Sequence, residues 1–182
     1  MEIREERAAD AAAVRGVHET AFGGDGAKVA DLNDALRATL AESAGLSLVA
    51  IEGGEVVGHV LFTTSLLDAP RRLAEVQVLS PVGVRPEKQR RGVGSALIRR
   101  GLEILDERSV PLVFLEGDPA YYRRLGFRPG GGLGFRKPSL RIPDAAFQVY
   151  PLAAHEPWMT GTLVYSPVFW QHDCVGLRDP EP

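Results

Sequence analysis

The sequence contains a single cysteine, Cys174, among its 182 residues. One cysteine excludes a disulfide within the chain and provides no cysteine pattern for a metal site. No uninterrupted apolar run approaches the roughly 18 residues that a membrane-spanning helix needs. The N-terminal residues are rich in acids and have no apolar core, so we expect no secretory signal. These absences predict a cytoplasmic protein without a membrane segment.

Other functional signatures are missing as well. The four histidines, His18, His59, His155 and His172, are too scattered to match a metal-ligand spacing, so we expect no metal site. His18 lies at the end of a predicted helix, where the helix dipole would favour its charged form. No G-x-S-x-G segment occurs, which excludes the nucleophile elbow of a serine hydrolase. The net charge of −3 argues against a general nucleic-acid binder, which needs a large basic face.

Positive charge is nevertheless concentrated in one stretch, Arg85–Arg100, which has six Lys or Arg residues and one acid. Val82 and Val84 alternate as in a strand just before this stretch, and apolar residues at helical spacing follow Gly94. The first N–H groups of a helix have no partner within it, and the helix dipole adds positive potential there. Glycines at 92 and 94 let a ligand approach the backbone closely. We therefore expect a pyrophosphate at this helix start.

The spacing of the glycines indicates which class of phosphate ligand this helix start could bind. The dinucleotide pattern G-x-G-x-x-G/A needs a third small residue, and Leu97 occupies that position. A Walker A loop is excluded because no Gly-Lys-Ser/Thr triplet is present. The pattern that remains is Q-x-x-G-x-G, formed by Gln89, Gly92 and Gly94.

The rest of the chain predicts one α/β unit with a mixed sheet. Gly53-Gly54 predicts a hairpin turn, and Asp118 is expected to cap a two-turn helix that ends at Gly126. Further helices are expected after Asp10, after Gly26 and after Gly94. Strands are expected at residues 2–4, 46–52, 55–67, up to 84, 111–116, 146–152 and 161–165.

The Q-x-x-G-x-G pattern resembles the acyl-CoA pyrophosphate loop of the GNAT N-acetyltransferase superfamily. The likeness extends to R-P-E-x-Q-R-R-G-V-G-S-A-L at 85–97 and to the later Y-x-x-x-G-F of Tyr122, Gly126 and Phe127. The segments L-S-P-V and G-D-P-A-Y-Y-R-R-L-G-F are similar to a bacterial branch of predicted acetyltransferases. The resemblance implies one GNAT domain over residues 1–177, an α+β fold whose helices flank a mixed, mostly antiparallel sheet. Residues 178–182 are expected to form a frayed tail.

The resemblance also implies roles at an acetyl-CoA site. The backbone of Val82 and Val84 would pair with the pantetheine arm, and N–H groups from Arg91 to Ser95 would hold the pyrophosphate. Tyr122 would lie near the thioester sulfur. The usual Asn before that helix is replaced by Asp118, which cannot donate a hydrogen bond to the ligand. The expected acetyl-CoA-binding residues are Val82, Gly83, Val84, Gln89, Arg90, Arg91, Gly92, Val93, Gly94, Ser95 and Tyr122.

Acetyl transfer to an amine needs a neutral amine and a stabilised leaving thiolate. A lysine-like amine has a pKa of about 10.4, so a general base would assist at neutral pH. Glu116, which ends a buried strand, and Glu75, which precedes the motif, are the candidate bases. Tyr122 is expected to hydrogen-bond to the thiolate at least as much as to protonate it, because a phenol is a weaker acid than a thiol.

The acceptor stays open among a small-molecule amine, an antibiotic and a protein amine. The resemblance implicates Phe22–Gly26 and Gly130–Arg141 beside the acceptor. Three basic residues in the second segment could meet an acidic acceptor or simply be solvated: Arg136, Lys137 and Arg141. Three aromatic residues fit either the core or a homodimer contact: Trp158, Phe169 and Trp170. The competing hypothesis is a CoA-binding module without turnover.

Overall fold

The computed structural model describes residues 1–179, which form two compact units. Unit 1 contains residues 1–63 and 79–108, and unit 2 contains residues 64–78 and the described residues from 109 onward. Two long strands, β3 (Glu55–Asp68) and β4 (Leu73–Val84), belong to both units. Residues 180–182, which complete the tail expected at 178–182, lie outside the described residues.

Antiparallel strands form the sheet of unit 1. β1 (Glu2–Glu5) is the edge strand and pairs with β2 (Leu46–Glu52), which pairs with β3 across the turn at Gly53-Gly54. The φ angles of the two glycines are 59° and 84°, in the left-handed region that glycine adopts without strain. The predicted edge strand and hairpin are therefore confirmed.

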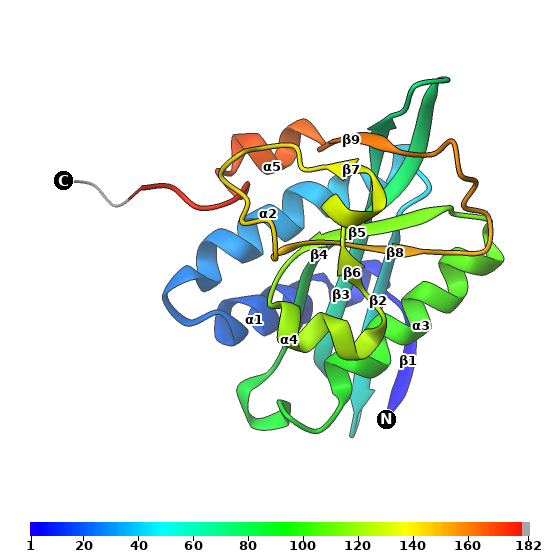
Figure 1. The fold of residues 1–182 in the computed structure, drawn as a ribbon. Helices are drawn as coiled ribbons and strands as arrows, with labels where there is room; N and C mark the ends of the chain where they lie inside the picture. The colour runs from blue at the N-terminus through cyan, green and yellow to red at the C-terminus, as the bar shows by residue number, and fades with distance from the viewer. Residues whose placement is uncertain (180–182) are drawn as a thin grey trace. The chain divides into compact units, whose positions relative to one another are not determined.

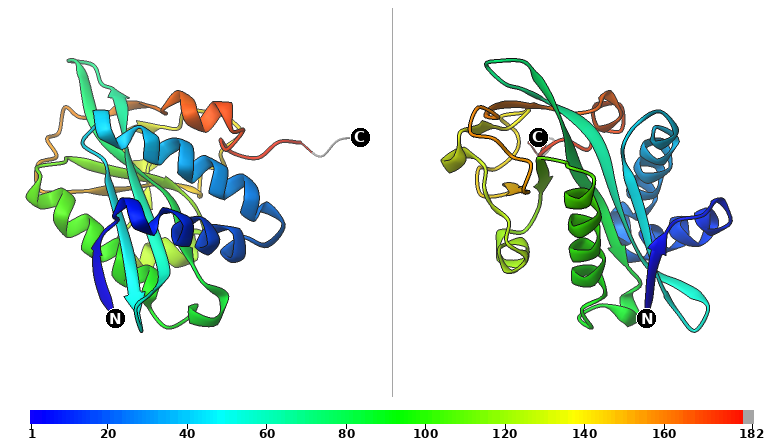
Figure 2. Two further views of the ribbon diagram at one scale, coloured as in Figure 1. Left: turned by 180° about the vertical axis from the view of Figure 1, so that it is seen from behind. Right: turned by 90° about the vertical axis from the view of Figure 1, so that its right-hand side faces the viewer.

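Helices cover both faces of the unit 1 strands (Figure 2). α1 (Ala11–Ala21) and α2 (Gly26–Ala38) run beside each other, and α1 packs on the sheet through a buried valine cluster. α3 (Val93–Glu107) covers the opposite face, where the Phe62 ring fills the space that a side chain at Gly101 would need. The valine cluster under α1 comprises Val14, Val17, Val49 and Val56.

A short buried strand is central to unit 2. β5 (Leu112–Glu116) pairs in parallel with β4 at Gln77 and Val78, and antiparallel with β8 (Phe147–Pro151). Its first four residues are buried, as its continuous apolar run predicts. The other elements are the strands β6 (Arg128–Pro129), β7 (Phe135–Arg136) and β9 (Gly161–Val164) and the helices α4 (Pro119–Tyr122) and α5 (Pro167–Gln171) (Figure 1).

The predicted fold class is confirmed, since the sheet is mixed and mostly antiparallel and helices flank it. The strands β6 and β7, inside a glycine-rich segment, were not predicted, because strands of two residues have no measurable periodicity. The helix α5 was not predicted either, although Ser166 at the N-cap and Pro167 at the first helical position are helix-start signals. No helix between residues 1 and 179 combines the length and the apolar character that crossing a bilayer requires.

Candidate functional site

The start of α3 has the features of an anion site. Gly92, at the N-cap, has φ 83° and ψ 0°, and among the described residues no side chain caps the helix. A side chain at Gly92 would meet no atom within 4 Å, so the space over the loop is open. Arg90 and Arg91 are exposed, and neither forms an ion pair with a described carboxylate. First-turn N–H groups and two free guanidinium groups therefore face solvent together.

The loop that leads to this helix is held by the strands of unit 1. Arg85 donates from its backbone N–H to the carbonyl of Val57 at 2.9 Å and from Nε to the carbonyl of Val56 at 2.9 Å. Gln89 donates from its side chain back to the carbonyl of Val84 at 3.0 Å, which closes the loop on the end of β4. The pattern residue Gln89 therefore shapes the loop, and its side chain is engaged within the protein.

The end of β4 offers backbone groups on one edge. The ladder between β4 and β5 contains only two residue pairs, at Gln77 and Val78. Beyond them no described strand pairs with that edge of β4 from Leu79 to Val84. Val82 and Val84 are half-buried here, and Gly83 between them is buried. An extended ligand could add to this edge as a strand does.

Tyr122, in unit 2, has a buried ring and a hydroxyl that can donate a hydrogen bond. Its side chain is 9% exposed and contacts the rings of Tyr121 and Phe127 edge-on. Gly117 makes room for it, since a Cβ there would lie 2.3 Å from the ring. No described residue forms a hydrogen bond with the Tyr122 hydroxyl. Burial, with the nearby Tyr121 and Asp118, raises the Tyr122 pKa well above its ordinary value, so the hydroxyl stays protonated.

The two candidate carboxylate bases lie in different settings. Glu75 is exposed on β4. Glu116 accepts a hydrogen bond from the Tyr165 hydroxyl at 2.9 Å and another from the Gly176 backbone N–H at 3.0 Å. Burial raises the pKa of Glu116, although these hydrogen bonds oppose the shift. Both oxygens of Glu116 are thus engaged in hydrogen bonds to other residues of unit 2.

Unit 1 contains a buried polar chain that the sequence analysis did not predict. Nε2 of His18 lies 2.8 Å from Nδ1 of His59, and Nε2 of His59 lies 2.8 Å from Oγ of Ser47. Ser47 hydrogen-bonds to Glu6, and the other oxygen of Glu6 accepts from Arg37 at 2.8 Å. We call His18, His59, Ser47 and Glu6 the histidine chain. No spacing in the sequence relates these residues, so only the fold could reveal it.

Burial sets the charge of the histidine chain. It lowers the pKa of His18 to about 3 and also lowers that of His59, so both imidazoles are neutral at pH 7. The helix dipole at the end of α1 favours a charged His18, but desolvation outweighs the dipole at this fully buried ring. For Glu6 burial acts in the opposite sense, but hydrogen bonds from His59 and Ser47 and the charge of Arg37 leave its pKa below the ordinary value. Glu6 is therefore an anion.

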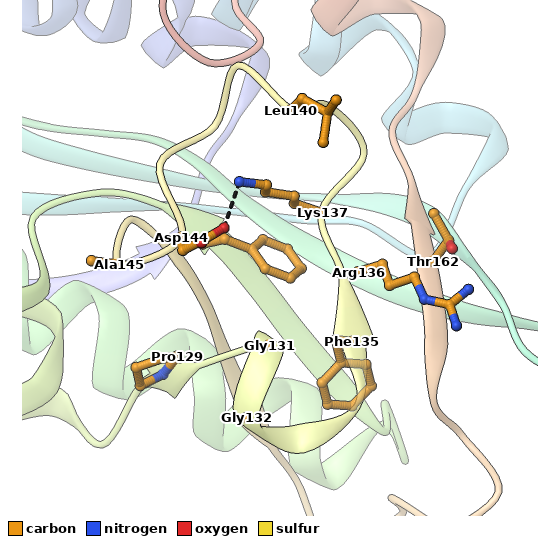
Figure 3. A pocket seen from close by; sticks show the side chains of 11 residues that line it. Pro129, Gly131, Gly132, Phe135, Arg136, Lys137, Leu140, Asp144, Ala145 and Thr162 are labelled. Atoms are coloured by element: carbon orange, nitrogen blue, oxygen red, sulfur yellow. Dashed lines mark hydrogen bonds and ion pairs between the residues drawn. The ribbon is translucent and has the colours of Figure 1, made fainter.

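Unit 2 has a cavity of about 630 Å³ in the segment expected to border the acceptor (Figure 3). Phe135 and Phe147 contribute apolar walls. Lys137 is paired with Asp144 at 2.5 Å and donates to the carbonyl of Ile142 at 2.6 Å, so this amine stabilises the segment. Within residues 1–179, no group of three or more His, Cys, Asp or Glu side chains could hold a metal ion.

Comparison with known proteins agrees with this geometry. The model of the acetyltransferase (GNAT) domain family matches residues 2–130. The chain is 36% identical over 158 residues to the uncharacterized N-acetyltransferase YjhQ of Escherichia coli (strain K12), which covers 85% of this chain and 86% of YjhQ. A crystal structure of the E. coli GNAT family N-acetyltransferase YhbS in complex with CoA superimposes with a TM-score of 0.81 and 29% identity, covering 92% of this chain and 91% of YhbS. A GNAT family acetyltransferase from Brucella melitensis in complex with acetyl-CoA has a TM-score of 0.72 and 36% identity, with 92% and 97% of the two chains covered.

Proposed function

Because the chain belongs to the GNAT acetyltransferase family, we propose that it transfers an acetyl group from acetyl-CoA to a primary amine by direct attack in a ternary complex. The observation that supports this most is the start of α3, where Gly92 is left-handed, no described side chain caps the helix, and two arginines are unpaired. The CoA and acetyl-CoA complexes of the two structural relatives support the same cosubstrate.

Acetyl-CoA would be bound mainly by backbone groups. In this proposal N–H groups from Arg91 to Ser95 hold the pyrophosphate, and Arg90 and Arg91 add charge from the side. The free edge of β4 at Val82 and Val84 pairs with the amides of the pantetheine arm. The glycines at 83, 92 and 94 place no side chain against the cosubstrate, Val93 buries its side chain and offers its N–H, and Gln89 holds the loop closed.

Tyr122 is proposed to act at the thioester sulfur. Its raised pKa makes it a poor acid toward a departing thiolate, whose pKa is about 8.5 when free cysteine is the guide. A protonated hydroxyl without a partner among the described residues is nevertheless a ready hydrogen-bond donor. Tyr122 therefore stabilises the negative charge that develops on sulfur as the C–S bond breaks.

The proposed function is tested by release of free CoA thiol from acetyl-CoA with a panel of amines, with the acetylated product identified by mass spectrometry. Replacing both free arginines, Arg90→Gln with Arg91→Gln, should weaken acetyl-CoA binding about 10-fold and reduce its salt dependence, because exposed charges each contribute about 1 kcal/mol or less. The matched control is Arg108→Gln, at the other end of α3 and paired with Glu5, which should bind acetyl-CoA as the wild type does. Tight CoA binding without turnover of any amine would favour a non-catalytic CoA-binding module.

A further inference from the structure

The hydrogen-bond partners within the histidine chain determine which atom carries each proton. Ionised Glu6 can only accept, so Ser47 must donate its hydroxyl proton to it. The Ser47 oxygen then accepts from Nε2–H of His59, which leaves Nδ1 of His59 as an acceptor. That atom accepts from Nε2–H of His18. Nδ1 of His18 therefore has a lone pair and no proton.

The lone pair on His18 Nδ1 has no use within the protein. The His18 side chain is 0% exposed, and Nδ1 has no hydrogen-bond partner among the described residues. Leaving a buried acceptor unpaired costs about 1–3 kcal/mol, so the fold keeps this atom free against a penalty. A merely structural histidine pair would gain stability from a donor at this position.

The free nitrogen lies against β4 at Gly83. A Cβ on Gly83 would lie 2.8 Å from Nδ1 of His18, and the φ of Gly83 is outside the left-handed region. Glycine is therefore needed here for space and not for backbone conformation. Gly83 lies between Val82 and Val84, the residues proposed to pair with the pantetheine arm of acetyl-CoA.

The same imidazole lies under the segment expected beside the acceptor. The ring of Phe22 stacks on His18 with 6.0 Å between the ring centroids and an interplanar angle of 26°. Phe22 is itself 37% exposed, so its ring lies between the buried imidazole and solvent, and we expect an amine to approach His18 from this side.

We propose that the histidine chain is the general base of the transfer, with His18 Nδ1 as the atom that takes the proton from the amine nitrogen. This inference rests on the proposed acetyl transfer. It identifies a general base other than Glu75, which is exposed, and Glu116, whose two oxygens accept hydrogen bonds within unit 2. His18 is the catalytic residue, and His59, Ser47 and Glu6 are positioning residues that act through it.

The step balances as a series of proton transfers. The amine lone pair forms the C–N bond, the carbonyl π pair moves to oxygen, and the nitrogen of the adduct gives a proton to His18 Nδ1. His18 passes its Nε2 proton to His59, His59 passes its own to Ser47, and Ser47 passes its hydroxyl proton to Glu6. The oxyanion then re-forms the C=O bond, and the C–S pair leaves with sulfur. After the product departs, the transfers run in reverse and His18 Nδ1 releases the proton to water, which restores the starting tautomers.

The charged surroundings fit this direction of transfer. His18 is faced by neutral His59 from β3, and the charged groups near it are Glu6 and Arg37, which hydrogen-bond to each other. Since burial makes both imidazoles weak bases, the proton does not stay on either of them and is passed on to the Glu6 carboxylate, the anion at the end of the chain. The carboxylate lies at the far end of the chain from the proposed amine.

His18→Gln is the main test, because the amide of glutamine reaches about as far as Nε2 and can still donate to His59 while Nδ1 is lost. We expect kcat to fall about 100-fold at pH 7 with the KM for acetyl-CoA unchanged. Below the pKa of the amine the rates of the variant and of the wild type should both rise about tenfold per pH unit, since only free amine attacks, so the 100-fold difference between them should persist across this range. His172→Asn, at the C-cap of α5, is the matched histidine control and should keep wild-type kcat.

A second variant and one NMR spectrum test the proposal even if His18→Gln does not fold. Ser47→Ala keeps both imidazoles but removes the hydroxyl that links His59 to Glu6, and leaves His59 Nε2 and the nearest Glu6 oxygen 3.4 Å apart. We expect kcat to fall about 10-fold and the thermal midpoint to fall by a few degrees, because two buried groups lose a partner. Nitrogen-15 NMR of the wild type should show an unprotonated Nδ1 at His18. Wild-type kcat in both variants, or a protonated Nδ1, would overturn the histidine chain and leave the proposed function standing. A wild-type protein that releases no thiol with any amine would overturn both.

Discussion

Two partly buried glutamates, one in each unit, have pKa values displaced in opposite directions. Burial raises the pKa of Glu6 and of Glu116 alike, because both carboxylates lose water. Glu6 has the Arg37 guanidinium at 2.8 Å, and its pKa ends below the ordinary value. Glu116 accepts from a phenol and a backbone N–H and forms no ion pair with a described residue, and its pKa ends above.

The difference shows what compensates for the burial of a carboxylate. The hydrogen bonds from Tyr165 and the Gly176 N–H and the charge of Arg141 all lower the pKa of Glu116, but together they do not outweigh its desolvation. At Glu6 the hydrogen bonds from His59 and Ser47, with the charge of Arg37, do outweigh it. Glu6 is therefore an anion that can receive a proton through its neighbours, whereas Glu116 ties Gly176 and Tyr165 into unit 2.

Glu6→Gln should have the largest effect and tests the unit 1 side of the comparison. The amide keeps an acceptor for Ser47 but cannot take a proton, so we expect kcat to fall about 100-fold at an unchanged KM for acetyl-CoA. Loss of the charge beside Arg37 should also reduce the free energy of unfolding by about 2 kcal/mol, measured by urea denaturation. Glu19→Gln is the control, since Arg15 retains Asp31 and Asp34 as partners. An unchanged kcat would show that Glu6 is only structural.

Tyr122→Phe measures how much the Tyr122 hydroxyl, in unit 2, stabilises the charge on the thioester sulfur in the proposed transfer. A hydrogen bond to a charged atom is worth about 2 kcal/mol, so kcat at saturating acetyl-CoA should fall about 30-fold. Stability should not change, because the hydroxyl has no partner among the described residues. Tyr121→Phe, the neighbouring ring, should keep wild-type kcat. If Tyr122→Phe keeps full kcat as well, Tyr122 has no catalytic role.

Glu116→Gln should change kcat less than about 3-fold if the histidine chain is the base. It should lower the free energy of unfolding by about 1 kcal/mol, because one of the two hydrogen bonds to the carboxylate is lost. Steady-state kinetics and urea denaturation measure the two effects. A fall in kcat as large as that of Glu6→Gln would instead make Glu116 the base and reverse the comparison.

The pH dependence of stability should have opposite signs for the two glutamates. The lowered pKa of Glu6 gives a contribution that is present above pH 4.5 and is lost as the pH falls through its folded pKa. The raised pKa of Glu116 gives one that is present below pH 4.5 and is lost as the pH rises through its folded pKa. As the pH rises, the stability of the wild type relative to Glu6→Gln should therefore rise below pH 4.5, and that relative to Glu116→Gln should fall above pH 4.5. Slopes of equal sign would contradict the comparison.

Local signals in the sequence determined much of the fold and the position of the proposed acetyl-CoA site. Gly53-Gly54 specified a hairpin turn, and Asp118 caps α4 by accepting from Ala120 N–H at 2.8 Å, as expected. The Q-x-x-G-x-G pattern located the loop and the start of α3. Each of these features depends on residues a few positions apart, so backbone conformation alone decides them.

The tertiary structure alone decided the histidine chain. His18 and His59 are 41 positions apart, and Ser47 and Glu6 are also 41 apart, so no periodicity joins them. Their pKa values depend on how much water the packed helix and strands remove and on which charge lies within a few ångströms. For His18 that desolvation outweighs the helix dipole, which the position of the residue at a helix end suggested. Residue type and helix position can be read from a sequence, but desolvation belongs to the packed fold.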